Sequence, residues 1–406
     1  MALLPVSDAK ARLLDRARPV TESETVPLGE AATRVLASDI QARLTQPPFN
    51  SSAMDGYALA AADAPQVGSE LTVIGSAAAG HAFEGTPGRG ETVRIFTGAP
   101  VPEGADTILI QEDAEKIGDN RIRTTFEVTT GRHIRPRGQD FAEGETVLKA
   151  GTVIDFSHLT VAAAMNHPTL PVFRKPKVAI LATGDELIQP GGTPAPAQII
   201  ASNTFGAAAL VRDNGGEVID LGIAPDRQDA IAAAIKRARD AGADILVTLG
   251  GASVGDHDLV QATLKASGME LDFWRIAMRP GKPLMVGSLD GMHVLGLPGN
   301  PVASMVTGML FLEPLLRLLA RLPERRREVH GITARPLAAN DQRQDYLRAK
   351  VTRDEQGNLI ADANPKQDSS MMKIFAHADG LIVREPHAPE IPAGEPCRIL
   401  LIRPFE

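Results

Sequence analysis

The sequence has a single cysteine, Cys397, which excludes an internal disulfide and a thiolate zinc cage and fits a reducing cytosol. None of its nine histidines stands in an H-E-x-x-H pattern. Its most apolar run, residues 305–320, is interrupted by Glu313 and Pro314, so no window approaches the roughly 18 uninterrupted apolar residues of a transmembrane helix. Residues 1–5 are too short for a signal peptide, and we therefore expect a cytoplasmic protein.

Concentrated charge is also missing. The formal net charge is -8, and the acidic residues are dispersed along the chain. This distribution predicts neither a nucleic-acid surface nor a membrane patch. We find no internal repeat and no low-complexity tract. With 406 residues, the chain is long enough for two to four domains, each with its own core.

Strand and helix patterns alternate in the middle of the chain. Short apolar runs predict strands at residues 178–181, 217–223, 245–249 and 294–295. Helical periodicity lies between them, at residues 204–213, 227–241 and 259–266. Such alternation specifies right-handed crossovers and a parallel sheet, whose carboxyl-end loops gather at one edge. Ligands bind along that edge.

The loop that follows residues 245–249 carries the strongest chemical pattern, GGASVGDHD. Gly250, Gly251 and Ser253 allow a sharp turn whose backbone N–H groups can point at an anion. Asp256 and Asp258 favour a cation, so the loop suits a metal carried with a phosphate. An ordinary strand-to-helix turn with solvated acids explains this stretch equally well.

Two neighbouring predicted strands end in similar loops. The strand at residues 178–181 leads into Gly184, which is followed by Asp185 and Glu186. The strand at residues 294–295 leads into a stiff turn, GLPGNP, that contains Pro298 and Pro301. Three such loops at one sheet edge favour a binding site over three unrelated turns.

A basic loop, WRIAMRPGKP, spans residues 274–283. Its cations are Arg275, Arg279 and Lys282, and no acid stands among them. Such a loop can hold an oxyanion or a phosphate. A solvated basic surface is an equally good interpretation.

Three further patches are weak patterns on their own. Asp55 lies in SSAMDGYA, where β-like texture begins, and Thr97 ends a predicted strand before a loop with two prolines. A structural turn is the simpler interpretation of that loop. Ser369 belongs to a serine pair, which usually contacts solvent or caps a helix.

The rest of the chain predicts two helices and two β regions. Residues 8–17 predict an amphipathic helix with Ser7 as its N-cap, and residues 26–44 predict a helix that runs into a strand. Short β-like runs separated by glycine and proline occupy residues 51–141 and the chain after residue 324. They predict a small β domain of the barrel type at residues 51–141 and β structure after residue 324.

Six motifs together resemble one family. MDGYA, TGAPVPEGAD, TGDEL, GGASVGDHD, RPGKP and LPGNP occur in the order and approximate spacing of the molybdopterin molybdenumtransferase family, which includes MoeA and the E domain of gephyrin. The resemblance covers essentially the whole chain. It implies an elongated, multidomain α/β plus β homodimer, with a three-layer parallel-sheet α/β domain similar to molybdopterin adenylyltransferase and two small β domains. The domains it predicts are residues 1–50 with 142–174 (linker and dimerisation), 51–141 (small β), 175–324 (α/β, molybdopterin-binding) and 325–406 (C-terminal β-barrel).

The activity implied by the resemblance is the last step of molybdenum cofactor synthesis. Adenylylated molybdopterin and molybdate would be the substrates, and AMP would leave in a Mg²⁺-dependent hydrolysis. Molybdopterin adenylyltransferase and apo-molybdoenzymes would be partners, without nucleic acid or membrane. Two alternatives stay open: a molybdopterin adenylyltransferase, although stand-alone enzymes of that shape lack the MDGYA and TGAPVPEGAD region, and a noncatalytic gephyrin-like scaffold. The scaffold is disfavoured by the joint retention of Asp55, Thr97, Glu186 and Asp258.

The resemblance also implies roles for individual residues. The Mg²⁺ ligands would be Glu186 and Asp258, with Asp185 and Asp256 as secondary candidates. Asp55 and Thr97 would complete the catalytic set of the other subunit. The pocket for molybdate and molybdopterin would be lined by Arg275, Arg279, Lys282, Ser369, Pro298, Pro301, Gly250, Gly251 and Ser253. Relatives often carry lysine at positions 275 and 279, so here a planar guanidinium replaces an ammonium.

Overall fold

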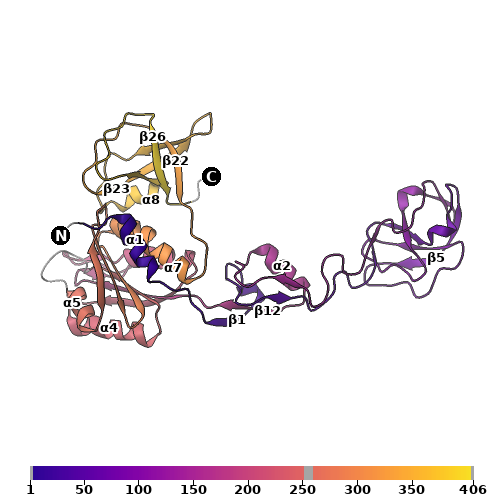
Figure 1. Ribbon diagram of the computed structural model, residues 1–406, viewed down its shortest axis with the longest axis horizontal. Helices are drawn as coiled ribbons and strands as arrows, with labels where there is room; N and C mark the ends of the chain where they lie inside the picture. The colour runs from indigo at the N-terminus through magenta and orange to yellow at the C-terminus, as the bar shows by residue number, and fades with distance from the viewer. Residues whose placement is uncertain (1–2, 251–258, 404–406) are drawn as a thin grey trace. The chain divides into compact units, whose positions relative to one another are not determined.

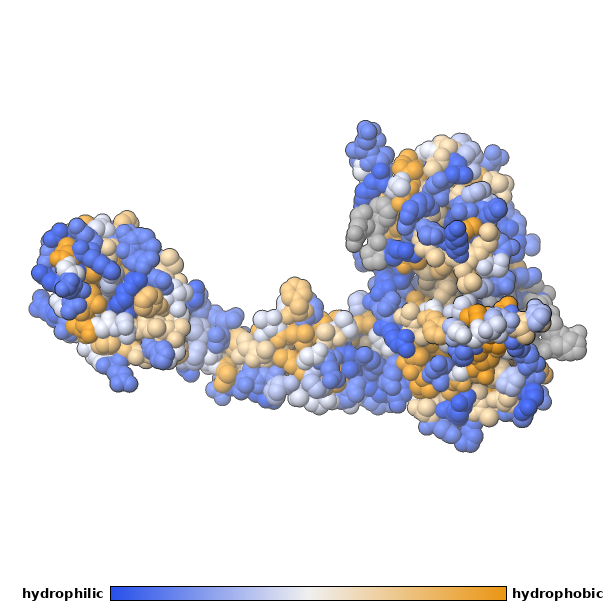
Figure 2. Space-filling view, turned by 180° about the vertical axis from the view of Figure 1, so that it is seen from behind, coloured by the Kyte–Doolittle hydropathy of each residue, from blue (hydrophilic) through white to orange (hydrophobic). Residues whose placement is uncertain are grey.

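The computed structural model describes residues 3–250 and 259–403, and the chain folds as two compact units. Unit 1 comprises Met1–Glu24 and Phe173–Glu406, and unit 2 comprises Thr25–Val172. Unit 2 is therefore inserted into unit 1 after the first helix (Figure 1). In the face shown in Figure 2, hydrophilic residues are spread over both units, in line with the dispersed charge of the sequence.

The first helix, α1 (Val6–Asp15), belongs to unit 1 because Ala9 and Leu13 are buried in its core. The contacts of this helix therefore lie in unit 1, while the domain boundaries stay a prediction. The helix also begins earlier than predicted, with Pro5 rather than Ser7 at the N-cap position. Leu4 accounts for the early start, since it bridges to Ile276 and fixes the chain just before the helix.

A six-stranded sheet in the order β16-β13-β17-β21-β20-β18 forms the centre of unit 1. Its strands are β13 (Lys177–Thr183), β16 (Glu217–Ala224), β17 (Ile245–Leu249), β18 (Glu270–Arg275), β20 (Pro283–Leu289) and β21 (Met292–Leu297). Strands β16, β13, β17 and β21 pair in parallel, as predicted. By contrast, β20 is antiparallel to both of its neighbours. Only Asp290 and Gly291 separate β20 from β21, and so short a hairpin can join only antiparallel strands.

Helices cover both faces of this sheet. Val178 and Ile180 of β13 pack in one apolar cluster with α3 (Asn203–Asp213) and the helices after β21. Ala179 and Leu181 pack in the other cluster, with α4 (Gln228–Asp240) and α5 (Leu259–Ala266). Since alternate strand residues point to opposite faces, the sheet lies between two helical layers, as predicted.

The most apolar segment of the sequence is a core helix. It consists of α6 (Pro301–Thr307), a π-helical turn (Gly308–Leu312) and α7 (Glu313–Leu319). It has the length and composition of a membrane span, but 72% of its apolar window is buried inside the structure. The charge of Glu313, the acid that interrupts the run, is compensated by Arg327, whose Nε and Nη2 donate hydrogen bonds of 2.7 and 2.6 Å to the carboxylate.

The C-terminal part of unit 1 is a closed β-barrel, as predicted. Its strands are β22 (Glu328–Thr333), β23 (Gln344–Arg353), β24 (Leu359–Ala363), β25 (Gly380–Arg384) and β26 (Pro396–Leu401). The pairing of β23 with both β24 and β25 closes the ring. A short strand from the basic loop, β19 (Met278–Arg279), joins β23 in parallel. This pairing places Arg279 opposite Asp345 and ties the basic loop to the barrel.

Unit 2 contains the predicted small β domain, a six-stranded sheet in the order β7-β4-β6-β5-β9-β8. Its strands are β4 (Gly56–Leu59), β5 (Glu70–Ala77), β6 (Glu91–Ile95), β7 (Thr107–Ile110), β8 (Ala114–Gly118) and β9 (Arg121–Thr124). Smaller pairings join β1 (Ser23–Pro27) to β12 (Thr169–Phe173), β2 (Ile40–Gln41) to β11 (Thr146–Leu148) and β3 (Ser51–Ser52) to β10 (Ile134–Arg135).

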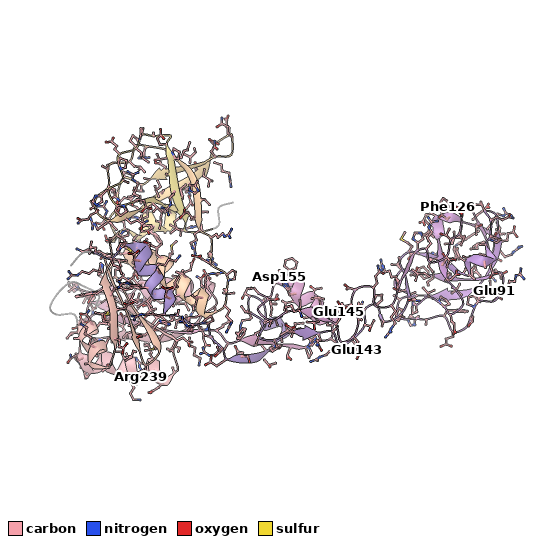
Figure 3. All side chains as sticks on the ribbon, in the orientation of Figure 1. Glu91, Phe126, Glu143, Glu145, Asp155 and Arg239 are labelled. Atoms are coloured by element: carbon pink, nitrogen blue, oxygen red, sulfur yellow. The ribbon has the colours of Figure 1, made fainter. Side chains whose placement is uncertain are left out.

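The predicted helix at residues 26–44 is wrong. Only Leu28–Glu30 forms a helical turn, of the 3-10 type. Val35 and Leu36 instead make β-bridges to Val153 and Val172, and their apolar neighbours form a core with residues from the second half of unit 2. The one long helix of this core, α2 (Phe156–Ala164), begins at Asp155 (Figure 3), which accepts hydrogen bonds from two backbone N–H groups of its first turn.

Candidate active site

Most of the predicted site residues described in unit 1 meet at one cavity of about 850 Å³. It lies at the carboxyl ends of β13, β17 and β21, where the parallel part of the sheet presents its loops. The basic loop and a loop of the barrel complete its wall. The predicted residues that line it are Glu186, Gly250, Arg279, Lys282, Pro298 and Ser369.

Other predicted residues have different positions. Arg275 stacks its guanidinium over the Trp274 ring at 5.2 Å, and it is not among the described residues that line the cavity. Pro301 is the first residue of α6, directly beyond the cavity turn. The remaining predicted residues of the glycine-rich loop lie outside the described residues: Gly251, Ser253, Asp256 and Asp258.

Glycine shapes the cavity at two strand ends. Gly184 has a φ of 144°, and a Cβ atom there would clash with the carboxylate of Glu186. Gly250 has a φ of 96°, and its Cβ would lie 2.9 Å from the carbonyl oxygen of Thr183. Both positions favour glycine for conformation, and at Gly250 the neighbouring backbone also leaves no space for a Cβ atom. The Glu186 carboxylate lies over the Gly184 backbone because that residue has no side chain.

Asp226 is a cavity residue that the sequence analysis missed. It follows the end of β16 and is positioned by Asp185, whose Oδ1 accepts a hydrogen bond of 3.1 Å from the Asp226 backbone N–H. The sequence did contain a signal for Asp226, because this acid lies just beyond a predicted strand of the same sheet. We predict Asp185 as a secondary metal ligand. In the structure its carboxylate accepts a hydrogen bond that fixes the loop containing Asp226.

The carboxylates of Glu186 and Asp226 fit a divalent cation of the Mg²⁺ type. Mg²⁺ prefers oxygen ligands and is usually held by one or two carboxylates together with phosphate oxygens and water. No cluster of three or more metal-binding side chains occurs within residues 3–250 and 259–403. Two carboxylates suit a cation that also binds phosphate oxygens.

The basic side of the cavity contains Arg279, Lys282 and Arg343. Arg279 donates from Nε to Asp345 at 2.6 Å and from Nη2 to the second oxygen of the same carboxylate. This hydrogen bonding to Asp345 raises the pKa of Arg279 and keeps it charged. In the part of the chain that the structure describes, no carboxylate forms an ion pair with Lys282.

The barrel loop with Ser369 is fixed to the proline turn. Asn300 donates from Nδ2 to Ser369 Oγ at 2.8 Å, and the Val302 N–H donates to the Ser369 carbonyl at 3.0 Å. Arg348, whose side chain is fully buried, donates from Nη2 to the Asp368 carbonyl at 3.1 Å. Sequence reasoning missed Asn300 and Arg348, since these contacts exist only when barrel and sheet are packed together.

In unit 2, the structure brings Asp55 and Thr97 together across 42 residues of chain. Asp55 Oδ1 accepts hydrogen bonds of 2.8 Å from both the backbone N–H and the Oγ1 of Thr97. The backbone N–H bond, followed by the hydroxyl bond, lowers the pKa of Asp55 and favours its carboxylate form. Two residues that we predict to act together are therefore direct partners.

A second cavity of unit 1, of about 450 Å³, lies at the opposite edge of the sheet. Its main charges already neutralise each other, since Arg174 donates to both oxygens of Asp244 at 2.7 and 2.9 Å. Burial lowers the pKa of His293 in its wall, which favours the neutral ring. The carboxyl-edge cavity is the better candidate for chemistry because it contains acids and cations that are not all paired with each other.

Comparison with known proteins agrees with this architecture. Residues 4–166 match the MoeA N-terminal region (domain I and II), residues 179–318 a probable molybdopterin binding domain, and residues 330–402 the MoeA C-terminal region (domain IV). The fold and the cavity therefore define a multidomain protein built around an α/β domain of the molybdopterin-binding class.

Full-length relatives extend this result. The chain is 33% identical to a molybdopterin molybdenumtransferase of Haemophilus influenzae, over 99% of both chains. It is 34% identical to molybdopterin molybdenumtransferase 2 of Mycobacterium tuberculosis, over 96% of both chains. A crystal structure of the MoeA protein from Pyrococcus horikoshii covers 100% of both chains with a TM-score of 0.83 and 29% identity. The chain belongs to the molybdopterin molybdenumtransferase family, a family of transferases, which confirms the resemblance.

Proposed function

We propose that this protein transfers molybdenum from molybdate to adenylylated molybdopterin and releases AMP, as the last step of molybdenum cofactor synthesis. The observation that carries the proposal is a single cavity whose wall contains acids, among them Glu186 and Asp226, and cations, among them Arg279 and Lys282. The acids suit a cation carried with the adenylyl phosphate. Guanidinium and ammonium groups bind a doubly charged oxyanion by charge-assisted hydrogen bonds.

Glu186 and Asp226 would hold Mg²⁺, and Asp256 and Asp258 remain predicted ligands outside the described residues. When bound, Mg²⁺ supplies Lewis-acid polarisation of a phosphate oxygen. The protein's own contribution is positional. Asp185 orders the Asp226 loop, and Asn300 orders Ser369 beside the cations.

The purified protein should release AMP from adenylylated molybdopterin when Mg²⁺ and molybdate are both present. Chromatography of the nucleotides measures AMP, and activation of an apo-molybdoenzyme measures the cofactor. Chelation with EDTA should stop AMP release, and added Mg²⁺ should restore it, because the two acids cannot substitute for the cation. Formation of adenylylated molybdopterin from ATP by the same sample would contradict the proposal and support an adenylyltransferase instead.

We further propose a homodimer in which Asp55 and Thr97 of one subunit serve the cavity of the other. The family resemblance motivates this arrangement, and the Asp55–Thr97 pair supports a chemical role for both residues. Both hydrogen bonds use Oδ1 of Asp55, so its second oxygen can still accept one from a substrate.

Mixing inactive Asp55→Ala and Glu186→Ala proteins should restore about a quarter of wild-type AMP release, because random exchange gives half heterodimers with one intact site each. The measurement is AMP release after subunit exchange has been verified with two differently tagged chains. Two Asp55→Ala proteins with different tags, mixed in the same way, are the control and should stay inactive. Absence of recovery in verified heterodimers would refute the shared site.

A further inference from the structure

Two carboxylates hold the arginines that line the cavity. Asp345 accepts hydrogen bonds from Nε and Nη2 of Arg279. Asp341 accepts from Nε and Nη2 of Arg343 at 3.3 and 2.7 Å. The Oδ2 atom of Asp341 also lies 3.6 Å from Nη1 of Arg279. Asp341 therefore stands between both cavity arginines.

The two acids differ in how firmly they are placed. The Asp345 side chain is 6% exposed, and Asp345 is the second residue of the barrel strand β23, opposite Arg279. The Asp341 side chain is 43% exposed and precedes that strand. Asp345 uses one edge of the Arg279 guanidinium, so Nη1 remains for another acceptor. Among the described residues, the more exposed Asp341 pairs with Nη1.

We propose that Asp341 is an internal counterion of two arginines in the cavity wall, and that it must release Arg279 and Arg343 when a tetrahedral oxyanion binds there. The inference rests on the proposed function, because it assigns the basic side of the cavity to molybdate. Its consequence is that Asp341 weakens oxyanion binding and keeps the substrate exchangeable. A carboxylate that competes for the same N–H groups acts as a tethered competitor.

The competition holds over the whole working pH range. Hydrogen bonds from Arg343 lower the pKa of Asp341 to about 2, so Asp341 stays ionised in any neutral or mildly acidic buffer. Asp345 does not compete in this way, because releasing Arg279 would leave a buried carboxylate uncompensated.

The test is calorimetric titration of the full chain with sodium molybdate at low ionic strength. Asp341→Asn should bind molybdate about fivefold more tightly than wild type, since an exposed charge pair is worth up to about 1 kcal/mol. Perrhenate, a tetrahedral oxyanion of similar shape with one charge, should gain only about twofold. Asp341→Glu keeps the charge and should stay near wild type.

A matched control is available in the same barrel. Asp362 pairs with Arg335, and the exposures of this pair, 47% and 43%, equal those of Arg279 and Asp341. Asp362→Asn should leave molybdate affinity unchanged. If Asp341→Asn binds molybdate no more tightly than wild type, or if perrhenate gains as much as molybdate, the inference is wrong.

Lys282→Met separates the inference from the proposed function. If Lys282→Met weakens molybdate binding, the oxyanion binds in this cavity. If Lys282→Met weakens molybdate binding and Asp341→Asn does not change it, only the counterion role of Asp341 is wrong. If wild type binds no molybdate, or if Lys282→Met does not change molybdate binding, then both the assignment of the basic side of the cavity to molybdate and the counterion role of Asp341 are wrong.

Discussion

Glu186→Gln should lower the rate of AMP release about 100-fold while the protein remains folded. Glutamine keeps the size of the side chain, but it replaces a charged oxygen ligand with a neutral amide. Metal coordination supplies several kcal/mol of transition-state stabilisation, and a loss of about 2.7 kcal/mol corresponds to a factor of about 100. Part of the lost rate should return at high Mg²⁺ concentration, because the defect lies in holding the cation. The measurement is single-turnover AMP release as a function of Mg²⁺.

Glu217→Gln is the matched control for this experiment. Glu217 is an exposed glutamate at the first position of β16, at the other end of the same sheet. We expect wild-type AMP release from this variant. Wild-type AMP release from Glu186→Gln would remove Glu186 from the metal assignment.

Arg327→Met should lower the free energy of unfolding of unit 1 by about 3–5 kcal/mol, because it leaves Glu313 buried without its main partner. The side chains of Glu313 and Arg327 are only 4% and 10% exposed, and they share two hydrogen bonds. Arg327 also donates to the carbonyls of Leu401 and Ile402 at the end of the barrel. The substitution therefore removes a contact between the core helix and the barrel.

Urea denaturation followed by circular dichroism measures this effect, with the two units treated as separate transitions. Arg335→Met serves as the control, because it removes an exposed arginine from its pair with Asp362 in the same barrel. A surface pair contributes at most about 1 kcal/mol. Equal shifts of the transition midpoint in the two variants would contradict the special role of the buried pair.

The sheet of unit 1 could be predicted because its pattern is local. Ile245, Leu246 and Val247 are apolar in succession, and a short run of this kind is typical of a strand covered on both faces. The antiparallel direction of β20 was missed, although its Asp290-Gly291 dipeptide is a strong hairpin signal. By contrast, no local signal identifies the structure of residues 26–44, whose bridges reach Val153 and Val172.

The same distinction separates the predicted and the missed parts of the site. Glu186, Gly250 and Pro298 directly follow strands, so sheet topology alone brings them to one edge. The partners of the basic loop could not be predicted, because Arg279 meets Asp345 only through the pairing of β19 with β23. The basic loop at residues 274–283 has no acid near it in the sequence, but in the folded protein its Arg279 is paired with acids. Its acids come from a different domain.

The insertion of unit 2 also sets the order in which the protein can assemble during translation. The ribosome delivers α1 first, but the strands and helices that bury Ala9 and Leu13 appear only after residue 176. At about 5–20 residues per second, the intervening chain takes on the order of 10 s to synthesise. During that interval α1 lacks the partners that bury its apolar face, whereas by its end residues 25–172 have all the partners of their own core. Unit 2 can therefore fold before unit 1, whose first helix waits for roughly the last 230 residues of the chain to bury it.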